Sequence, residues 1–230
     1  MAKLTWDASG ARIYETGTDR GVLYPKTTTG EYGVGVAWNG LTGVTESPSG
    51  AEETALYADN IKYLSLYSTE DFGCTIECYT YPEEWALCDG SAEIAAGVMA
   101  AQQTRRSFGF SYRTILGNDE QLNDYGYKIH IVYGATASPS DKSYETVNDS
   151  PSAITFSYEV KTIPIRFAND AYKPTSVLTI DSTKADPDAL EDLEDILYGT
   201  TLADPRLPLP DEVIQIMSGG STGDTGETGN

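Results

Sequence analysis

Two stretches, FGFSYR at residues 108–113 and YKIHIVY at residues 127–133, decide the fold class, because apolar side chains occupy every second position in each. Successive side chains of a β-strand point to opposite faces, so this alternation predicts strands with one buried face. The same period recurs in FGCTIECY at residues 72–79 and in ITFSYEV at residues 154–160. Shorter strands are predicted at residues 35–38, 61–67 and 177–180. The chain is therefore predicted to be mainly β.

Polar connections separate these strands. Residues 117–126 are predicted to be a loop between two strong strands, and residues 137–151 are rich in Ser, Pro and Asp. Residues 16–35 contain several glycines, a proline and three consecutive threonines. This segment is too long and too polar for a hairpin turn, and loops of that size commonly carry function. We therefore expect a functional loop at residues 16–35.

One helix is well signalled near the C-terminal end. Asp186 is a good N-cap residue and Pro187 suits the first helical position. An apolar stripe follows, with Leu193 at its centre, and Gly199 ends the pattern. The sequence predicts a helix over about 187–198 that packs flat on a sheet. A shorter helical turn is predicted at residues 82–88, ended by Gly90.

The composition limits the classes of function. Fifteen basic and thirty-five acidic side chains leave a formal net charge of −20, which disfavours binding to nucleic acid and to anionic membranes. No stretch approaches the roughly 18 apolar residues of a membrane span, and residues 1–17 lack the apolar core of a signal peptide. The three cysteines, Cys74, Cys78 and Cys88, are expected to be free thiols in a reducing cytoplasm.

The search for chemistry yields no catalytic, cofactor-binding or metal-binding residues. The single histidine, His130, lies within an alternating strand and is expected to be a surface or interface residue. The glycines at residues 30–35 run into a strand and lack the Lys-Ser/Thr ending of a phosphate loop. A pair of acids facing each other across a cleft, as in a glycosidase, stays open.

Several stretches resemble the major tail protein, or tail tube protein, of long-tailed bacteriophages and prophages of Gram-positive bacteria. They are TWDASGARIYETGTDRGVLYP (5–25), GVAWNGLTGVTESPSGAEETALYADNIKYLSL (35–66), YTYPEEWALCDGS (79–91), FGFSYRTILGND (108–119), HIVYGATASPSDKSYETVNDSPSAITFSYEV (130–160), DALEDLEDILYGT (188–200) and DPRLPLPDEV (204–213). The likeness covers about residues 4–216. It rests on the number and order of these stretches, since none of them is a catalytic motif.

The resemblance implies a fold and an assembly. The fold is mainly β, with two packed antiparallel sheets, sandwich- or barrel-like in the tail-tube manner, and one flanking α-helix. This domain would cover residues 1–217, and the Gly- and Thr-rich residues 218–230 would be a flexible acidic tail. Six copies would form a ring, and rings would stack through a long loop into the tube that conducts DNA during ejection. The expected inter-ring loop is the segment at 16–35, with Thr16, Gly17, Asp19, Arg20, Gly21, Gly30 and Gly33.

The resemblance also implies partners and a location. The partners would be copies of the chain, a tape-measure protein, the neck or terminator and tail-tip proteins, and phage DNA that passes without specific binding. No cofactor, membrane or enzymatic activity is expected, and the protein would be assembled in the host cytoplasm and belong to the virion tail. An acidic channel would let DNA slide rather than bind. Glu77 and Glu159 are the candidate channel acids, because each lies on the polar side of an alternating strand.

Two other functions stay open at this point. The chain could form a different ring of the tail, a tube terminator. It could also be a monomeric β-sandwich module that binds carbohydrate. These readings differ in whether the purified protein forms tubes, single rings or monomers.

Overall fold

The structure is a computed structural model that describes residues 3–147, 149, 152–168 and 172–219. The chain is mainly β, with 45% of its residues in strands and 12% in helices, as the alternating stretches predict. Eight strands form the largest sheet: β1 (Tyr14–Pro25), β2 (Val36–Trp38), β3 (Leu41–Glu46), β8 (Gly73–Cys78), β11 (Phe108–Asn118), β12 (Leu122–Ala137), β13 (Phe156–Thr162) and β14 (Val177–Asp181). Their pairing is antiparallel throughout.

The longest strand, β12, joins two layers of this sheet. The strand order is β2-β1-β11-β12-β13-β8-β3, and β14 also pairs with β12. Lys128–Val132 of β12 pair with β14, whereas Ala135–Ala137 pair with β13. Gly134 lies between these two regions at a φ of 59°, and a Cβ there would lie 2.2 Å from the carbonyl oxygen of Ile163. Only glycine fits where β12 changes partners.

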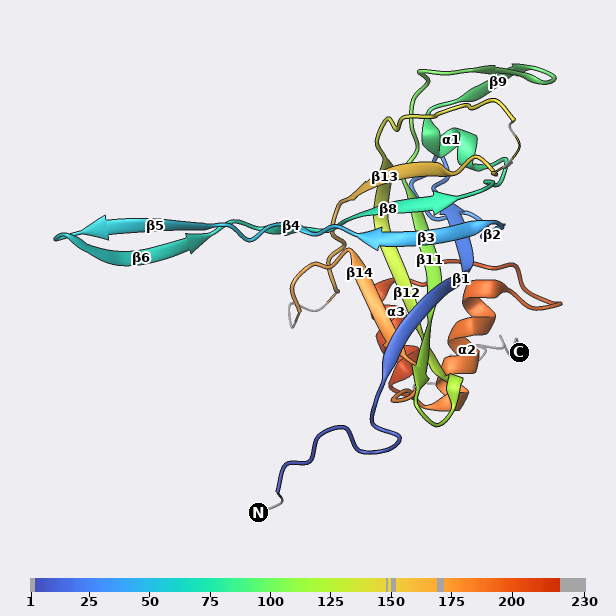
Figure 1. Ribbon diagram of the computed structural model, residues 1–230. Coiled ribbons are helices and arrows are strands. Elements are labelled where there is room, and N and C mark those ends of the chain that lie inside the picture. The colour runs from blue at the N-terminus through green and yellow to red at the C-terminus, as the bar shows by residue number, and fades with distance from the viewer. Residues whose placement is uncertain (1–2, 148, 150–151, 169–171, 220–230) are drawn as a thin grey trace, which may run out of the picture.

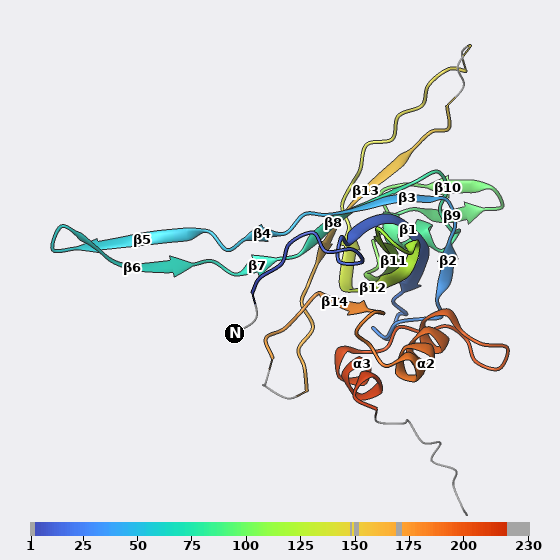
Figure 2. The ribbon, with the colours of Figure 1, turned by 60° about the horizontal axis from the view of Figure 1, so that its bottom comes forward.

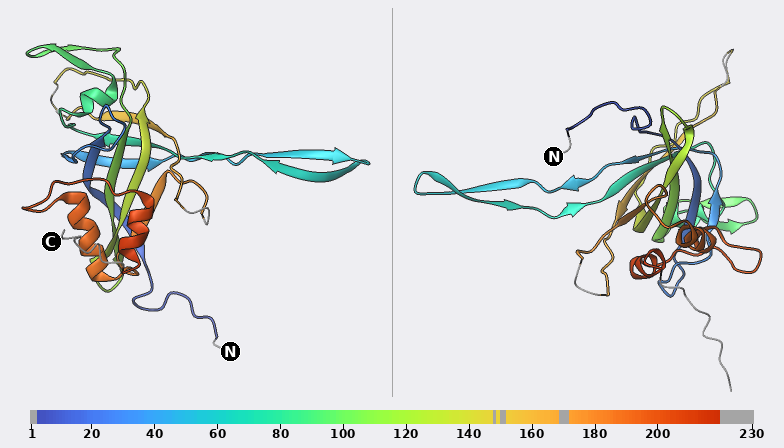
Figure 3. Two further views of the ribbon diagram at one scale, coloured as in Figure 1. Left: turned by 180° about the vertical axis from the view of Figure 1, so that it is seen from behind. Right: turned by 90° about the horizontal axis from the view of Figure 1, so that it is seen from below.

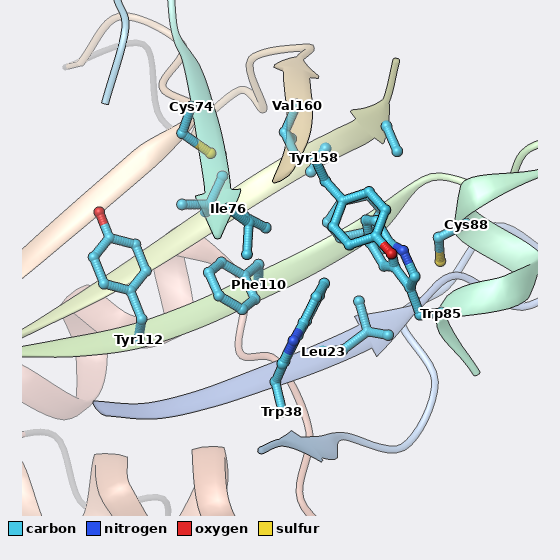
Figure 4. Close-up of a cluster of buried hydrophobic side chains, with 14 of the residues drawn as sticks. Leu23, Trp38, Cys74, Ile76, Trp85, Cys88, Phe110, Tyr112, Tyr158 and Val160 are labelled. Carbon is cyan, nitrogen blue, oxygen red and sulfur yellow. The ribbon is translucent and has the colours of Figure 1, made fainter. Parts of the chain in front are cut away.

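The two layers cross each other steeply (Figure 1). We call β2, β1, β11, β12 and β14 the central sheet, and β3, β8 and β13 the outer sheet. The first core lies between the sheets and is rich in aromatic rings (Figure 4). The Trp38 ring lies 4.7 Å from that of Trp85 and 5.5 Å from that of Phe110. Such tilted and edge contacts stabilise beyond the burial of apolar area alone.

A short helix closes one end of this core. Helix α1 (Trp85–Asp89) places Trp85 and Cys88 in the core, and Gly90 ends it in the left-handed conformation, so the predicted helical turn is confirmed. The described cysteines are free and buried. Burial raises the pKa of Cys74 and that of Cys88 to about 12, so these thiols are unreactive at neutral pH.

The second core lies on the opposite side of the central sheet, under helices α2 (Pro187–Tyr198) and α3 (Pro210–Met217), which lie side by side in Figure 3. The range predicted for α2 is confirmed, and the Asp186 side chain accepts hydrogen bonds from the backbone of Asp188 and Ala189. Leu193 is fully buried against Ile129 and Ile131 of β12. Helix α3 was not predicted, so two helices flank this sheet, in place of the one expected. The part of the chain that the structure describes contains no helix that is both long and apolar enough to cross a membrane.

Three small two-stranded sheets lie apart from the large one. Their strands are β4 (Ser49–Gly50) with β7 (Glu70–Asp71), β5 (Glu53–Ala58) with β6 (Ile61–Tyr67), and β9 (Ala92–Ala95) with β10 (Val98–Ala100). The pairs β4–β7 and β5–β6 follow one another in a single long projection from the body (Figures 1 and 2). The flexible tail predicted at 218–230 lies, from residue 220 onward, outside the described residues.

The prediction of a loop at residues 16–35 is wrong for its first half. Strand β1 covers Tyr14–Pro25 and pairs with β11, and its residues 21–24 are buried. The pairing shifts between Thr16 and Thr18 and again between Asp19 and Val22. Gly17 and Arg20 have positive φ at these two irregularities. The glycine content that suggested a loop instead serves bulges within a strand.

The burial of Leu193 gives a test of the second core. Replacing it with Asp places an unpaired carboxylate among aliphatic side chains, so we expect the free energy of unfolding to fall by several kcal/mol. Urea unfolding followed by circular dichroism measures this loss. Glu191→Asp, on the exposed side of the same helix, is the control and should change little. Equal stability of the two variants would contradict the packing of α2 on the sheet.

Candidate assembly surfaces

The most distinctive feature of the molecule is a long hairpin, residues 47–72, which we call the arm. It leaves the body after β3 and returns into β8, and Figures 1 to 3 show it extending far from both sheets. The amide of Ser47 donates a hydrogen bond to the Gly73 carbonyl at 2.8 Å, directly beyond the last β3–β8 pair, Glu46 and Cys74. The arm therefore continues the outer sheet by one hairpin.

Local sequence explains why this segment forms a hairpin. Asp59 and Asn60 join β5 to β6, and both have positive φ, as a two-residue turn of the hairpin-favouring kind requires. At the base, a Cβ on Gly50 would lie 2.2 Å from the Thr69 carbonyl oxygen, so glycine is needed where the strands approach. The turn and the base thus fix the two ends of the arm.

The register of the arm separates its two faces. Directly opposed residues share a face, and so do alternate residues of each strand. The aliphatic face therefore consists of Thr54, Leu56, Ala58, Ile61, Leu64 and Leu66, from the pairs Thr54–Leu66, Leu56–Leu64 and Ala58–Ile61. A shift between Leu56 and Tyr57 adds one residue to β6, and this bulge keeps Ile61 on the same face.

The other face of the arm is polar and aromatic. Lys62 and Ser65 both donate to the carboxylate of Glu53. Tyr67 lies opposite Glu53, and Tyr57 lies opposite Lys62, so both tyrosines belong to this face. The arm is thus an amphipathic ribbon, and Glu53, Lys62 and Ser65 on its polar face are hydrogen-bonded to one another.

The aliphatic face is open to solvent in the single chain. Leu56 is 42% exposed, Ile61 65% and Leu66 53%. Isolated two-stranded hairpins are at best marginally stable in water, and contiguous exposed apolar side chains mark interaction surfaces. The arm therefore has the character of a segment that becomes covered by a partner.

The two predicted channel acids lie on one surface of the body. Cys74, Ile76 and Cys78 of β8 point into the first core, so Glu77 points outward. Glu77 pairs with Ser157, and Glu159 lies two residues farther along β13 on the same outward face. Such diagonal neighbours on adjacent strands are within reach of long side chains. The structure therefore brings Glu77 and Glu159 together on the polar outer surface of the outer sheet.

The residues predicted for the inter-ring loop are divided between strand and turn. Thr16, Gly17, Asp19, Arg20 and Gly21 lie in β1, whereas Gly30 and Gly33 lie in the connection to β2. Two of them are tied to the body by ion pairs. Asp19 accepts two hydrogen bonds from Arg113, both at 2.7 Å, and Arg20 lies 3.3 Å from Glu194 of α2. These contacts hold β1 to β11 and to α2, which is incompatible with a free inter-ring loop at these residues.

Of the two places expected for His130, surface or interface, the surface is wrong for the single chain. Its imidazole is buried at the edge of the first core and stacks on the Tyr112 ring, with centroids 4.6 Å apart and planes 3° from parallel. Two carboxylates flank the ring, Glu15 3.8 Å from Nε2 and Glu46 3.6 Å from Nδ1. Burial lowers the pKa of His130 below 6.5, although both carboxylates act to raise it.

No family model matches the chain, and no curated protein matches it. Among the described residues, no group of three or more His, Cys, Asp or Glu side chains is arranged to hold a metal ion. The arm, the outer face of the outer sheet and the His130 cluster are thus the features from which a function is argued.

The sequence contains a hairpin signal for the arm at residues 59–60. Residues 61–67 are a predicted strand, but the partner strand at residues 53–58 was missed. The dipeptide Asp59-Asn60 between two strand-forming stretches is a hairpin signal. This signal indicates a projecting hairpin at the arm, in place of the loop predicted at residues 16–35.

The buried imidazole predicts how stability depends on pH. Below 6.5 the unfolded chain binds a proton at His130 more readily than the folded chain, so the free energy of unfolding falls as the pH falls from 6.5 through the folded pKa. His130→Gln should flatten this dependence between pH 7.5 and 5.5, measured by urea unfolding at each pH. Burial raises the pKa of Glu15, but hydrogen bonds from Lys128 and Thr114 lower it, and the resulting pKa is below 4.5. The stability that Glu15 contributes is therefore lost only below pH 4.5. An unchanged slope in the variant would contradict the burial of His130.

Proposed function

We propose that this protein is the major tail protein of a long-tailed bacteriophage, a subunit that assembles into hexameric rings stacked as the tail tube. The observation that carries the proposal is the amphipathic arm, whose aliphatic face is left uncovered by the part of the chain that the structure describes. The resemblance of the sequence to that family over residues 4–216 supports it independently. The two-layer β body with helices on one side is compatible with the tail-tube fold.

In this proposal the arm takes the stacking role that the sequence placed at residues 16–35. Its length lets it reach a neighbouring copy, and covering Leu56, Ile61 and Leu66 removes apolar surface from water. The body keeps its own cores, because the buried side chains of both clusters lie outside residues 47–72. The subunit can thus fold first and assemble afterwards.

The proposed partners follow from the same role. They are copies of the chain, a tape-measure protein within the growing tube, the neck or terminator and tail-tip proteins, and DNA that passes through the channel. The protein is proposed to be structural, not enzymatic, and to be assembled in the host cytoplasm as part of the virion. The outer surface around Glu77 and Glu159, where Lys161 lies 3.7 Å from Glu159, is the proposed channel lining, because acids on it disfavour the binding of DNA.

Removing the arm tests the assembly role. Joining Gly50 to Glu70 through a two-residue turn deletes both faces of the arm but leaves the two cores intact. We expect a folded monomer that forms no tubes in electron micrographs of negatively stained, concentrated protein. A matched deletion that shortens the β9–β10 hairpin controls for the loss of a projecting hairpin. Tubes formed by the arm deletion would overturn the stacking role, and single rings from the intact protein would favour a tube terminator.

Point variants separate the two faces of the arm. Leu66→Lys places a charge on the aliphatic face, whereas Ser65→Lys places the same charge on the adjacent, polar face. We expect Leu66→Lys to abolish tube formation and Ser65→Lys to retain it, because only the first buries a charge in the contact. Sedimentation velocity measures the fraction in tubes. Equal loss in the two variants would mean that the aliphatic face is not the contact.

The channel assignment has its own test. Glu77→Lys together with Glu159→Lys replaces two acids by two bases on the proposed lining, so tubes should bind double-stranded DNA at low salt, roughly tenfold or more tightly than before. Filter binding at 50 mM and 200 mM salt measures the change and its salt dependence. The control is Glu191→Lys with Asp192→Lys, the same charge change on the exposed side of α2. Equal DNA binding by both double variants would place Glu77 and Glu159 outside the channel.

A further inference from the structure

The root of the arm carries an inward-pointing carboxylate. Glu46 is the last residue of β3 and pairs with Cys74, immediately before Ser47 begins the arm. Its side chain points toward the first core, where the hydroxyl of Tyr112 donates a hydrogen bond to Oε1 at 2.7 Å. The Glu46 side chain is 43% exposed, so this carboxylate lies at the rim of the first core, on the residue next to the start of the arm.

A second partner for Glu46 lies beside the first. Nδ1 of His130 is 3.6 Å from the same Oε1 atom, just beyond hydrogen-bond distance. The hydroxyl of Thr114 donates to Glu15 at 2.6 Å, so its oxygen accepts from Nε2–H of His130 at 3.0 Å. This network leaves the lone pair of the neutral ring on Nδ1, where the hydroxyl of Thr179 lies at 3.4 Å. Nδ1 is thus the atom that would take up a proton.

Three of the strands around the imidazole contribute charged groups that act on its protonation. Strand β1 supplies Glu15, β3 supplies Glu46, and β12 supplies Lys128, which pairs with Glu15. The remaining neighbours carry no net charge at neutral pH or are already paired: the Tyr112 phenol on β11, the Cys74 thiol on β8, and Asp181 on β14, which pairs with Lys184. The four charged side chains therefore sum to −1 when His130 is neutral and to zero when it is protonated.

We propose that His130 is a proton-operated latch on the root of the arm. A proton from solvent binds the Nδ1 lone pair, and the new Nδ1–H donates to Oε1 of Glu46, which then binds both Tyr112 and His130. Glu46 is already bound to Tyr112 of β11, and it thereby gains a second bond, to β12, that holds the last rung of β3 more firmly against the central sheet. Because the arm starts at the next residue, the latch restricts the direction in which the arm projects. The link to assembly rests on the proposed function, but the latch itself is a property of the monomer.

The latch is open at neutral pH. Burial lowers the pKa of His130 below 6.5, so the ring is neutral near pH 7 and takes up its proton only below pH 6.5. The cost of charging a buried ring exceeds the attraction of the two carboxylates, and stability still falls as the latch closes. Closing the latch therefore lowers the free energy of unfolding of the whole chain while it orders the residues that join the arm to the body.

The chain contains one histidine, so its titration can be followed without overlap. The experiment is a pH titration of the imidazole signals by nuclear magnetic resonance on dilute monomer. Two variants should move the pKa of His130 in opposite directions. Glu46→Gln removes the attracting charge and should lower it by about 0.5 or more, whereas Tyr112→Phe frees the carboxylate for His130 and should raise it. Asp204→Asn, an exposed acid on the loop after α2, is the control and should leave it unchanged.

The amide of Ser47 reports on the joint itself. This amide donates to the Gly73 carbonyl, and it should exchange its hydrogen with solvent more slowly as His130 takes up its proton. The exchange rates are corrected for their intrinsic dependence on pH. The protection should follow the His130 titration curve in the wild-type chain and should be lost in Glu46→Gln. The latch would be overturned if the exchange protection of the Ser47 amide did not change over the His130 titration. It would also be overturned if Glu46→Gln left the pKa of His130 unchanged.

Assembly measured separately keeps this test distinct from that of the proposed function. If tubes form, the ratio of their growth rates below and above the measured pKa of His130 should be severalfold larger for the wild-type chain than for Glu46→Gln, because a fixed arm loses less freedom on docking. Equal ratios with normal tubes would overturn the effect of the latch on assembly. Absence of tubes together with the expected Ser47 response would support the latch and reject the proposed function.

Discussion

The fold depends on one strand that is covered on both faces. Side chains of β12 alternate between the helices, where Ile129 and Ile131 lie, and the outer sheet, where Val132 lies. A strand in this position must also change partners, from β14 to β13, because the two layers diverge. Gly134 allows that change, since any side chain there would meet the Ile163 carbonyl. Both cores are therefore consequences of how β12 is placed.

The two cores already cover both faces of the central sheet, so the body is folded without apolar side chains from the arm. The aliphatic residues of the arm belong to neither core cluster, yet the register of β5 and β6, with its one bulge, keeps them on a single face. Such a pattern is costly for a monomer, because exposed apolar strands invite aggregation. Its presence on a projecting hairpin is best explained by a specific partner surface, which is the reasoning behind the proposed assembly.

The sequence predicted those parts of the structure that local signals specify. Alternation located β8, β11 and β12, and Asp186, Pro187 and Gly199 bounded α2. Helix α3 was not predicted, because Pro205, Pro208 and Pro210 precede or open it and proline disfavours a helix interior, although Pro210 occupies a first-turn position where proline is tolerated. Glycine is ambiguous in the same way, because both loops and β-bulges favour it. Gly17 lies at a bulge of β1, although its sequence context predicted a loop. The burial of His130 depends on Glu46 and Tyr112, which are brought to it only by long-range register, so no local pattern could reveal it.

The charge of the chain and the aliphatic face of the arm act over different distances. Copies with a net charge of −20 repel one another until screening reduces the field, over about 10 Å at moderate ionic strength. Apolar attraction acts only at contact, so encounters between bodies are unproductive unless the contact lies away from most of the charge. The arm meets this condition, because it carries its apolar residues beyond the body on a narrow ribbon. In the proposed assembly, acidity therefore keeps the free subunit soluble, while the arm selects the one approach in which contact outweighs repulsion.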